Sequence, residues 1–200
     1  MSGPEPYSPG PASGAEVVRE GETWTLVLVR ELVHPPATVW QALTDPEQLR
    51  EWAPFDADRN LGTAGTARLT TVGAPAPLVS EIRVTRAEAP RVLEYNWGEQ
   101  NLRWELTPLT GGRTRLTLWH SIERPYIAMG AAGWHICFDV LARLLSGRPM
   151  GRMVGPAAVK VGGWKRLFAE YTAQLGVAPG APAPPPGRRD PSPGAPDEGD

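Results

Sequence analysis

The stretch that decides the fold is GWHICFDVLARLL, Gly133 to Leu145, where a histidine, a cysteine and a carboxylate stand among apolar residues. These three residue types bind metals or carry out nucleophilic chemistry. In an α-helix each residue turns by about 100°, so His135 and Asp139 lie about 40° apart, whereas Cys137 lies about 200° from His135. Metal ligands must converge on one point, and a Cys/His pair must be in hydrogen-bond contact. The spacing therefore predicts a structural helix rather than a reaction centre.

This helix is apolar over more than half of its circumference. Its polar strip consists of His135, Asp139 and Arg143, spaced four residues apart so that neighbours can pair. A helix with so wide an apolar arc packs against protein on more than one side. Cys137 then acts as a small buried apolar residue. The other apolar positions are Trp134, Ile136, Phe138, Val140, Leu141, Leu144 and Leu145.

The composition suits one soluble domain. The 200 residues carry a net charge of −2, which implies no broad basic surface for nucleic acid. The single cysteine excludes an internal disulfide and a multi-cysteine metal site, and it fits a reducing compartment. The N-terminus has no secretory pattern, and no uninterrupted apolar stretch is long enough to span a bilayer. We expect a cytoplasmic protein with no nucleic-acid or membrane partner.

Both ends of the chain are of low complexity. Residues 1–20 and 177–200 are rich in Pro, Gly and Ala and lack the apolar groups that would offset the entropy of ordering. The C-terminal segment could be a proline-motif ligand, but it has no clean repeat, which favours a solvated tail. We therefore predict disordered tails on either side of a domain over residues 21–176.

The domain begins with a strand and two helices. TWTLVLVRELV, Thr23–Val33, is rich in β-branched and apolar residues and predicts a strand. HPPATVWQALTD opens with prolines, which the first turn of a helix tolerates. Asp45 then predicts an N-cap, with Pro46 at the first helical position and Gln48 at the third. This arrangement is a capping box for a short helix that ends near Trp52.

Five segments with alternating apolar and polar residues follow: GTARLTTV, PLVSEIRVTR, RVLEYNWG, NLRWELTPL and TRLTLWHSIE. Turn signals separate them, so neighbouring strands are expected to be antiparallel with one buried face. The period becomes helical from Ala128 to Leu145, and a glycine-rich loop over 147–163 leads to a last helix. The buried set of the last two strands is predicted to be Leu102, Trp104, Leu106, Leu116, Leu118 and His120.

The element order and several motifs resemble the heat-shock-protein-90 ATPase activator homologue family of the START-like (SRPBCC) superfamily. The matching motifs are ATVWQALTDPEQLREW, the segment with Gly62 and Gly65, RVLEYNW, AAGWHICFDVLARLLSGRP and GWKRLFAEYTAQLG. The resemblance covers roughly Thr23 to Gly176. It implies an α+β helix-grip fold, in which a curved antiparallel β-sheet wraps around a long C-terminal helix and leaves a cavity between them.

The resemblance also implies classes of function. The cavity of such folds commonly holds a small apolar or amphipathic ligand, and some relatives are cyclases, dehydratases or hydroxylase components. Eukaryotic co-chaperones of the family carry a separate amino-terminal domain that makes many of the chaperone contacts. This sequence has a Pro/Gly-rich segment in that place, which weighs against chaperone activation.

Among the candidate site residues, His120 lies on the inward pattern and is the best candidate for acid–base chemistry, since histidine titrates near neutrality. The alternative is a hydrogen-bonded, inert histidine. Tyr95 shares the alternation of Leu93 and Trp97, so its hydroxyl either enters the cavity or is satisfied by backbone. The eight tryptophans are a rich supply for an apolar pocket, although each could simply fill the core.

Three hypotheses follow. The first is binding of a small, largely apolar ligand in the cavity, without cofactor or metal. The second is a cyclase or dehydratase with His120 as general acid or base, although the sequence has no phosphate loop, paired-carboxylate signature or nucleophile elbow. The third is a module that assists a chaperone or another protein partner, which requires an exposed apolar patch. For the first, the predicted ligand-binding residues are Trp52, Tyr95, Trp97, Trp104, His120, Trp134 and Phe138.

Overall fold

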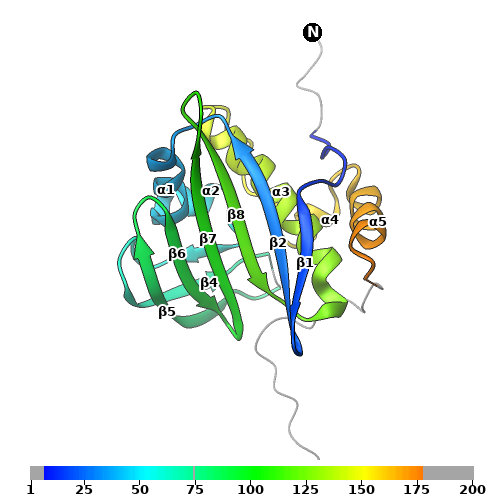
Figure 1. Ribbon diagram of the computed structural model, residues 1–200, viewed down its shortest axis with the longest axis horizontal. Coiled ribbons are helices and arrows are strands. Elements are labelled where there is room, and N and C mark those ends of the chain that lie inside the picture. The colour runs from blue at the N-terminus through cyan, green and yellow to red at the C-terminus, as the bar shows by residue number, and fades with distance from the viewer. Residues whose placement is uncertain (1–6, 74, 178–200) are drawn as a thin grey trace, which may run out of the picture.

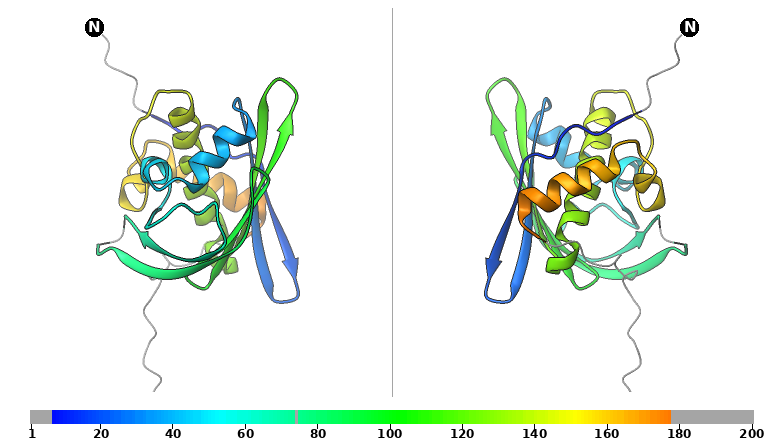
Figure 2. Two further views of the ribbon diagram at one scale, coloured as in Figure 1. Left: turned by 90° about the vertical axis from the view of Figure 1, so that its left-hand side faces the viewer. Right: turned by 90° about the vertical axis from the view of Figure 1, so that its right-hand side faces the viewer.

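Eight antiparallel strands curve around one long helix in the part of the chain that the computed structural model describes, residues 7–73 and 75–177 (Figure 1). The helices lie on the concave side of the sheet (Figure 2). This is the predicted α+β helix-grip architecture. The elements are β1 (Ala15–Glu20), β2 (Thr23–Leu32), α1 (Pro36–Thr44), α2 (Pro46–Trp52), β3 (Phe55–Ala57), β4 (Gly65–Thr71), β5 (Leu78–Glu88), β6 (Val92–Trp97), β7 (Gln100–Leu109), β8 (Arg113–Ser121), the short 3₁₀ helix η1 (Arg124–Tyr126), α3 (Ile127–Leu145), α4 (Pro156–Val159) and α5 (Trp164–Leu175).

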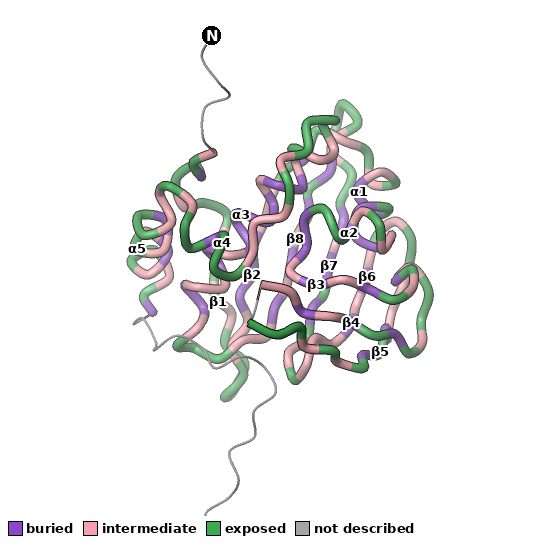
Figure 3. Tube along the Cα trace, turned by 180° about the vertical axis from the view of Figure 1, so that it is seen from behind, coloured by how far each residue is buried: buried purple, intermediate pink, exposed green. Residues whose placement is uncertain are grey.

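The strands lie in the order β1-β2-β8-β7-β6-β5-β4-β3, and each pair of neighbours is antiparallel. Short turns between consecutive strands from β4 to β8 produce this order, as the turn signals predicted. Buried positions alternate with exposed ones along the strands, which Figure 3 shows from behind. The buried set predicted for β7 and β8 is confirmed: all six residues are at most 3% exposed.

Two strands were missed by the sequence analysis. β1 lies within the segment predicted as a disordered tail, yet it pairs with β2 along its whole length, and the Val29 amide donates to the Gly14 carbonyl at 2.7 Å. The ordered domain therefore begins before residue 21. β3, which pairs with β4, has three residues and is too short to show an alternating pattern. The tail predictions for residues 1–6 and 178–200 fall outside the described residues.

The helix α3 is held on several sides, as its wide apolar arc predicted. It packs against β2, α1, α2 and α5. Within its polar strip, His135 is buried at only 2% exposed, whereas Arg143 at the C-terminal end is exposed. Arg124–Leu145 is long and apolar enough to cross a membrane by length and composition, but 61% of its most apolar window is buried in the fold. The apolar character of α3 is thus used in packing the core.

The helix boundary at Asp45 follows from its side chain. Asp45 Oδ1 accepts a hydrogen bond from the Glu47 amide at 2.9 Å, which confirms the predicted N-cap of α2. The Asp45 amide donates to the Gln41 carbonyl at 2.8 Å and so closes α1. Because that amide is already bonded, the Gln48 half of the predicted capping box is not formed.

Replacing Asp45 with alanine is expected to lower the free energy of unfolding by about 1 kcal/mol, since one amide of the first turn of α2 loses its acceptor. Asp45→Asn, which keeps a side-chain oxygen at this position, is the matched control and is expected to stay close to wild type. Urea unfolding followed by circular dichroism measures both. Equal losses in the two variants would contradict the capping role.

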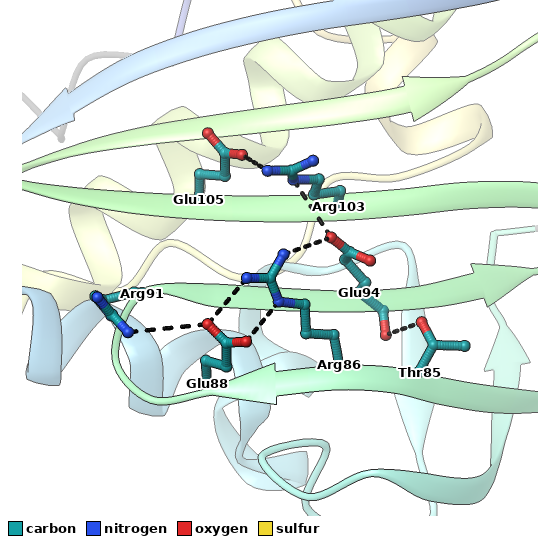
Figure 4. Close-up of polar contacts among 7 residues, drawn as sticks. All are labelled: Thr85, Arg86, Glu88, Arg91, Glu94, Arg103 and Glu105. Atoms are coloured by element: carbon teal, nitrogen blue, oxygen red, sulfur yellow. Dashed lines mark hydrogen bonds and ion pairs between the residues drawn. The ribbon is translucent and has the colours of Figure 1, made fainter.

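The outer face of the sheet carries a network of paired charges (Figure 4). Arg86 contacts Glu88 at 2.7 Å and Glu94 at 3.6 Å, and Glu94 also pairs with Arg103, which contacts Glu105. The Arg86 hydrogen bond lowers the pKa of the Glu88 carboxyl. Exposed pairs of this kind add little stability. Alternating signs of this kind are typical of a solvated face.

Candidate ligand-binding core

The structure brings all seven predicted ligand-binding residues together between the inner face of the sheet and α3. They come from five elements that are far apart in the sequence. We call this set, together with Phe55, the aromatic cluster. Its members are Trp52 of α2, Phe55 of β3, Tyr95 and Trp97 of β6, Trp104 of β7, His120 of β8, and Trp134 and Phe138 of α3.

Trp104 lies at the centre of the aromatic cluster. Its ring centroid lies 6.0 Å from that of Trp52, 5.4 Å from that of Trp134 and 6.1 Å from that of Phe138. The Trp52 and Trp134 rings meet it edge to face, at 86° and 83°, an arrangement favoured by the quadrupoles of aromatic rings. The rings pack against one another and themselves occupy the centre of the space in which a cavity was predicted.

Trp97 is the exception in burial. The other members of the aromatic cluster are at most 4% exposed, whereas Trp97 is half-buried at the end of β6. Its ring stacks on His120 with a centroid distance of 6.2 Å and an interplanar angle of 29°. Its indole N–H donates to the Thr71 hydroxyl at 2.8 Å. Trp97 therefore closes the cluster toward solvent and holds β6 to β4.

Trp52 has a structural role. Its indole N–H donates to the Ala42 carbonyl at 2.9 Å, which ties α2 to α1. The polar end of this side chain points at backbone, so Trp52 offers a ligand only apolar surface. The observed contacts of Trp52 are those of a residue that fills the core.

His120 is buried and bonded through both ring nitrogens. The Trp134 indole N–H donates to Nδ1 at 3.0 Å, so Nδ1 is unprotonated and Nε2 carries the hydrogen that it donates to Gln100 Oε1 at 2.7 Å. Burial lowers the pKa of His120 to about 3. The ring is thus neutral near pH 7 and, in this conformation, has no nitrogen available to a substrate. This geometry matches the inert alternative rather than a general acid or base.

Tyr95 has a hydroxyl group that is only half satisfied. Its oxygen accepts the Trp104 indole N–H at 3.1 Å. Within residues 7–73 and 75–177, no group accepts the hydroxyl hydrogen of Tyr95 in return. Burial raises the pKa of this phenol, so the hydrogen stays in place near neutral pH. A buried donor without an acceptor is costly, and it is the kind of group that a ligand can satisfy.

Three further residues that were not predicted from the sequence shape the aromatic cluster. Phe55 lies 5.2 Å from the Trp97 ring and 6.1 Å from the Tyr95 ring, between centroids. Thr71 and Gln100 hold Trp97 and His120 through hydrogen bonds. Phe55 stands close to Trp52 in the sequence, which was a usable signal. Thr71 and Gln100 carry no signal, because their contacts depend on the strand register.

The sequence of residues 33–146, more than half of the chain, matches the family described as "Activator of Hsp90 ATPase homolog 1-like protein". This chain belongs to that family. None of the curated proteins matches the sequence. Membership of this family is consistent with binding either a ligand or another protein, and it does not identify a specific partner.

Solved structures share the fold of this activator-homologue family member. A conserved protein of unknown function from Enterococcus faecalis, EF2215, superposes with a TM-score of 0.62 at 16% identity, covering 80% of this chain and 89% of its own. CalU16 from Micromonospora echinospora superposes with a TM-score of 0.56 at 20% identity, and the match covers 82% of this chain and 92% of CalU16. MLL2253 from Mesorhizobium loti superposes with a TM-score of 0.52 at 26% identity, and the match covers 63% of this chain and 99% of MLL2253. These similarities support the helix-grip fold.

His135, Cys137 and Asp139 of α3 are arranged as the helix geometry predicted. His135 Nε2 lies 3.5 Å from Asp139 Oδ2, while Cys137 is buried, which raises the pKa of its thiol to about 12. His135 Nδ1 contacts the Tyr171 hydroxyl at 2.8 Å, and Asp139 pairs with Arg30 at 2.9 Å. Among the described residues, no three His, Cys, Asp or Glu side chains are grouped to hold a metal ion.

Proposed function

We propose that this protein binds a small, largely apolar molecule that carries one hydrogen-bond acceptor, between the inner face of the sheet and α3. The unmatched hydroxyl hydrogen of Tyr95 is the observation that carries this proposal, because it lies inside the aromatic cluster and is 2% exposed. A ligand carbonyl or ether oxygen would accept it. The surrounding rings would bind the apolar body of the ligand.

Trp97 is the side chain that makes room for the ligand. Moving it breaks the hydrogen bond to Thr71, at about 1 kcal/mol, and the contacts with neighbouring rings, at about 0.5–1.5 kcal/mol each. Burying roughly 200 Å² of apolar ligand surface contributes about 5 kcal/mol before the cost of association. The two terms are similar in size, so a ligand of only this area would have nothing left to offset the cost of association, and displacement of Trp97 requires a ligand that buries a larger apolar area.

The hairpin between β6 and β7 suits this movement. Trp97 and Gln100 are register partners that flank the two-residue turn, and Gly98 in the turn has a φ of +62°. Trp97 covers the His120 ring, and Gln100 bonds to it. A shift of this hairpin would therefore uncover the outer side of the aromatic cluster while α3 and the other strands stay in place.

The Tyr95 hydroxyl is tested with two ligands of nearly equal size, 2-acetylnaphthalene and 2-ethylnaphthalene, of which only the ketone offers an acceptor. Wild-type protein is expected to bind the ketone more tightly, and Tyr95→Phe to lose about tenfold in affinity for the ketone alone. Trp97→Ala is expected to bind both ligands more tightly, because the position is already open. Isothermal titration calorimetry measures these affinities.

Tyr126→Phe, at a half-buried tyrosine of η1 outside the aromatic cluster, is the matched control and is expected to bind as wild type does. Equal affinities of wild type and Tyr95→Phe for the ketone would sink the assignment of Tyr95. No binding of either ligand to wild type or Trp97→Ala would overturn the proposed function.

The other two hypotheses have less support from the geometry. Enzymatic use of His120 is disfavoured by its two hydrogen bonds and lowered pKa. A protein-interaction module would present an exposed apolar patch. In the described part of the chain, the exposed large apolar residues are Val33, Val79 and Val159, which come from the loop after β2, from β5 and from α4. We propose that ligand binding takes place in the cytoplasm, where a single buried thiol is unremarkable.

A further inference from the structure

A hollow that is separate from the aromatic cluster lies at the C-terminal end of α3. Its volume is about 490 Å³, within the range of small-molecule sites. The N-terminal segment forms one side, and the end of α3 with the following turn forms the other. The lining residues are Tyr7, Ser8, Asp139, Ala142, Arg143, Ser146 and Arg148.

The backbone brings the two arginines of the hollow to the same helix end. The Gly147 amide donates to the Leu144 carbonyl at 3.0 Å, and the Arg148 amide donates to the Arg143 carbonyl at 2.9 Å. These two bonds form a Schellman motif, which requires the left-handed φ of +68° that Gly147 adopts. The chain therefore turns back at Gly147 and places Arg148 beside the last turn of α3.

The helix end does not need these guanidinium groups as caps. The Ser146 amide and hydroxyl both donate to the Ala142 carbonyl, at 3.1 and 2.8 Å, in addition to the two bonds of the Schellman motif. The carbonyls of Ala142, Arg143 and Leu144 are thus satisfied by local groups. The side chains of Arg143 and Arg148 are exposed and remain free to contact a ligand.

The charge of the hollow is positive. Asp139 is the acidic residue among its lining residues, and it already pairs with Arg30 at 2.9 Å and accepts the Tyr7 hydroxyl at 2.6 Å. By contrast, neither Arg143 nor Arg148 forms an ion pair with another residue in the described ranges. The guanidinium groups of Arg143 and Arg148 therefore face a space in which the charge of the Asp139 carboxylate is already balanced by Arg30.

We propose that this hollow binds a small phosphorylated molecule, with Arg143 and Arg148 as the groups that contact the phosphate. The planar fork of a guanidinium group matches two phosphate oxygens, and such charge-assisted bonds are stronger than neutral ones. The Tyr7 ring and the Ala142 methyl group supply apolar surface for the rest of the molecule. This inference is independent of binding in the aromatic cluster.

Titration with inorganic phosphate and with phenyl phosphate, at constant ionic strength, tests the site by calorimetry. Wild type is expected to bind both saturably, and phenyl phosphate more tightly. The double variant Arg143→Gln/Arg148→Gln is expected to lose at least about tenfold in affinity, since each lost contact is charge-assisted. Arg50→Gln/Arg83→Gln is the matched control, because both arginines are exposed and form no ion pair within the described residues.

The arms of this experiment separate the possible sources of phosphate. Co-sedimentation with phosphatidylcholine vesicles that contain phosphatidic acid measures binding to a lipid headgroup, and we expect none beyond that of the control variant. Vesicle binding that depends on Arg143 and Arg148, without binding of either soluble probe, would overturn the proposal. Equal loss in the control variant, or no saturable binding by wild type, would also overturn it.

Discussion

Trp104→Ala is expected to lower the free energy of unfolding by about 3–5 kcal/mol, the range for truncation of a buried tryptophan. The side chain is 1% exposed and its ring contacts Trp52, Trp134 and Phe138. Removing the Trp104 side chain leaves a void at the centre of the aromatic cluster. It also removes the indole N–H that donates to the Tyr95 hydroxyl. Urea unfolding followed by far-ultraviolet circular dichroism gives the free energy by linear extrapolation.

The matched control is Trp24→Ala in β2. Trp24 is half-buried under the guanidinium groups of Arg19 and Arg124, which lie 5.1 and 5.5 Å from its ring centroid. Its loss is expected to cost about 1 kcal/mol, because such exposed cation–π contacts are weak. Similar losses in the two variants would show that Trp104 is not the centre of a tightly packed cluster.

The stability of the fold is expected to fall between pH 7 and pH 5. Burial lowers the pKa of His120 to about 3, below the ordinary value of 6.5, so the unfolded chain binds a proton that the folded chain does not. This contribution is present above pH 6.5 and is lost as the pH falls toward 3. One pKa unit corresponds to about 1.36 kcal/mol, which gives a loss of about 2 kcal/mol at pH 5. Burial also lowers the pKa of His135, which acts in the same direction.

Comparison with His120→Gln isolates the contribution of His120. Urea unfolding at pH 8, 7, 6 and 5 is expected to show a loss between pH 7 and pH 5 that is smaller by about 2 kcal/mol in the variant. The value at pH 8 measures the separate cost of the lost contacts with Trp134 and Gln100. An identical pH dependence in both proteins would mean that His120 is not buried as a neutral ring.

Much of the fold could be predicted from the sequence, because it depends on local polarity. The alternation in NLRWELTPL placed Trp104 inside, and the helical period from Gly133 to Leu145 predicted a helix with several packed sides. Cys137 points away from His135 because residues two apart in a helix lie about 200° apart. In each case, the side chains themselves determine which face avoids water.

The contacts within the aromatic cluster could not be predicted in the same way. The bond between His120 and Gln100, and that between Trp97 and Thr71, join residues whose proximity depends on strand register and side-chain rotamers. β1 was missed because AEVVRE alternates weakly and lies at the sheet edge, where pairing with β2 supplies the order. The space under α3 was predicted as a cavity, yet ring packing decides how much of it stays open.

The sequence by itself determined which residues face the interior, and it determined that α3 is surrounded by protein. Both follow from the regular spacing of apolar side chains along each strand and helix, because these are the side chains that are buried. The tertiary structure alone decided how those residues meet: a neutral His120 bonded at both nitrogens, a Tyr95 hydroxyl left with an unused hydrogen, and two arginines brought to one hollow. Hydrogen-bond partners and shape depend on distances between segments remote in the chain, and those distances arise only when the whole sheet closes around the helix.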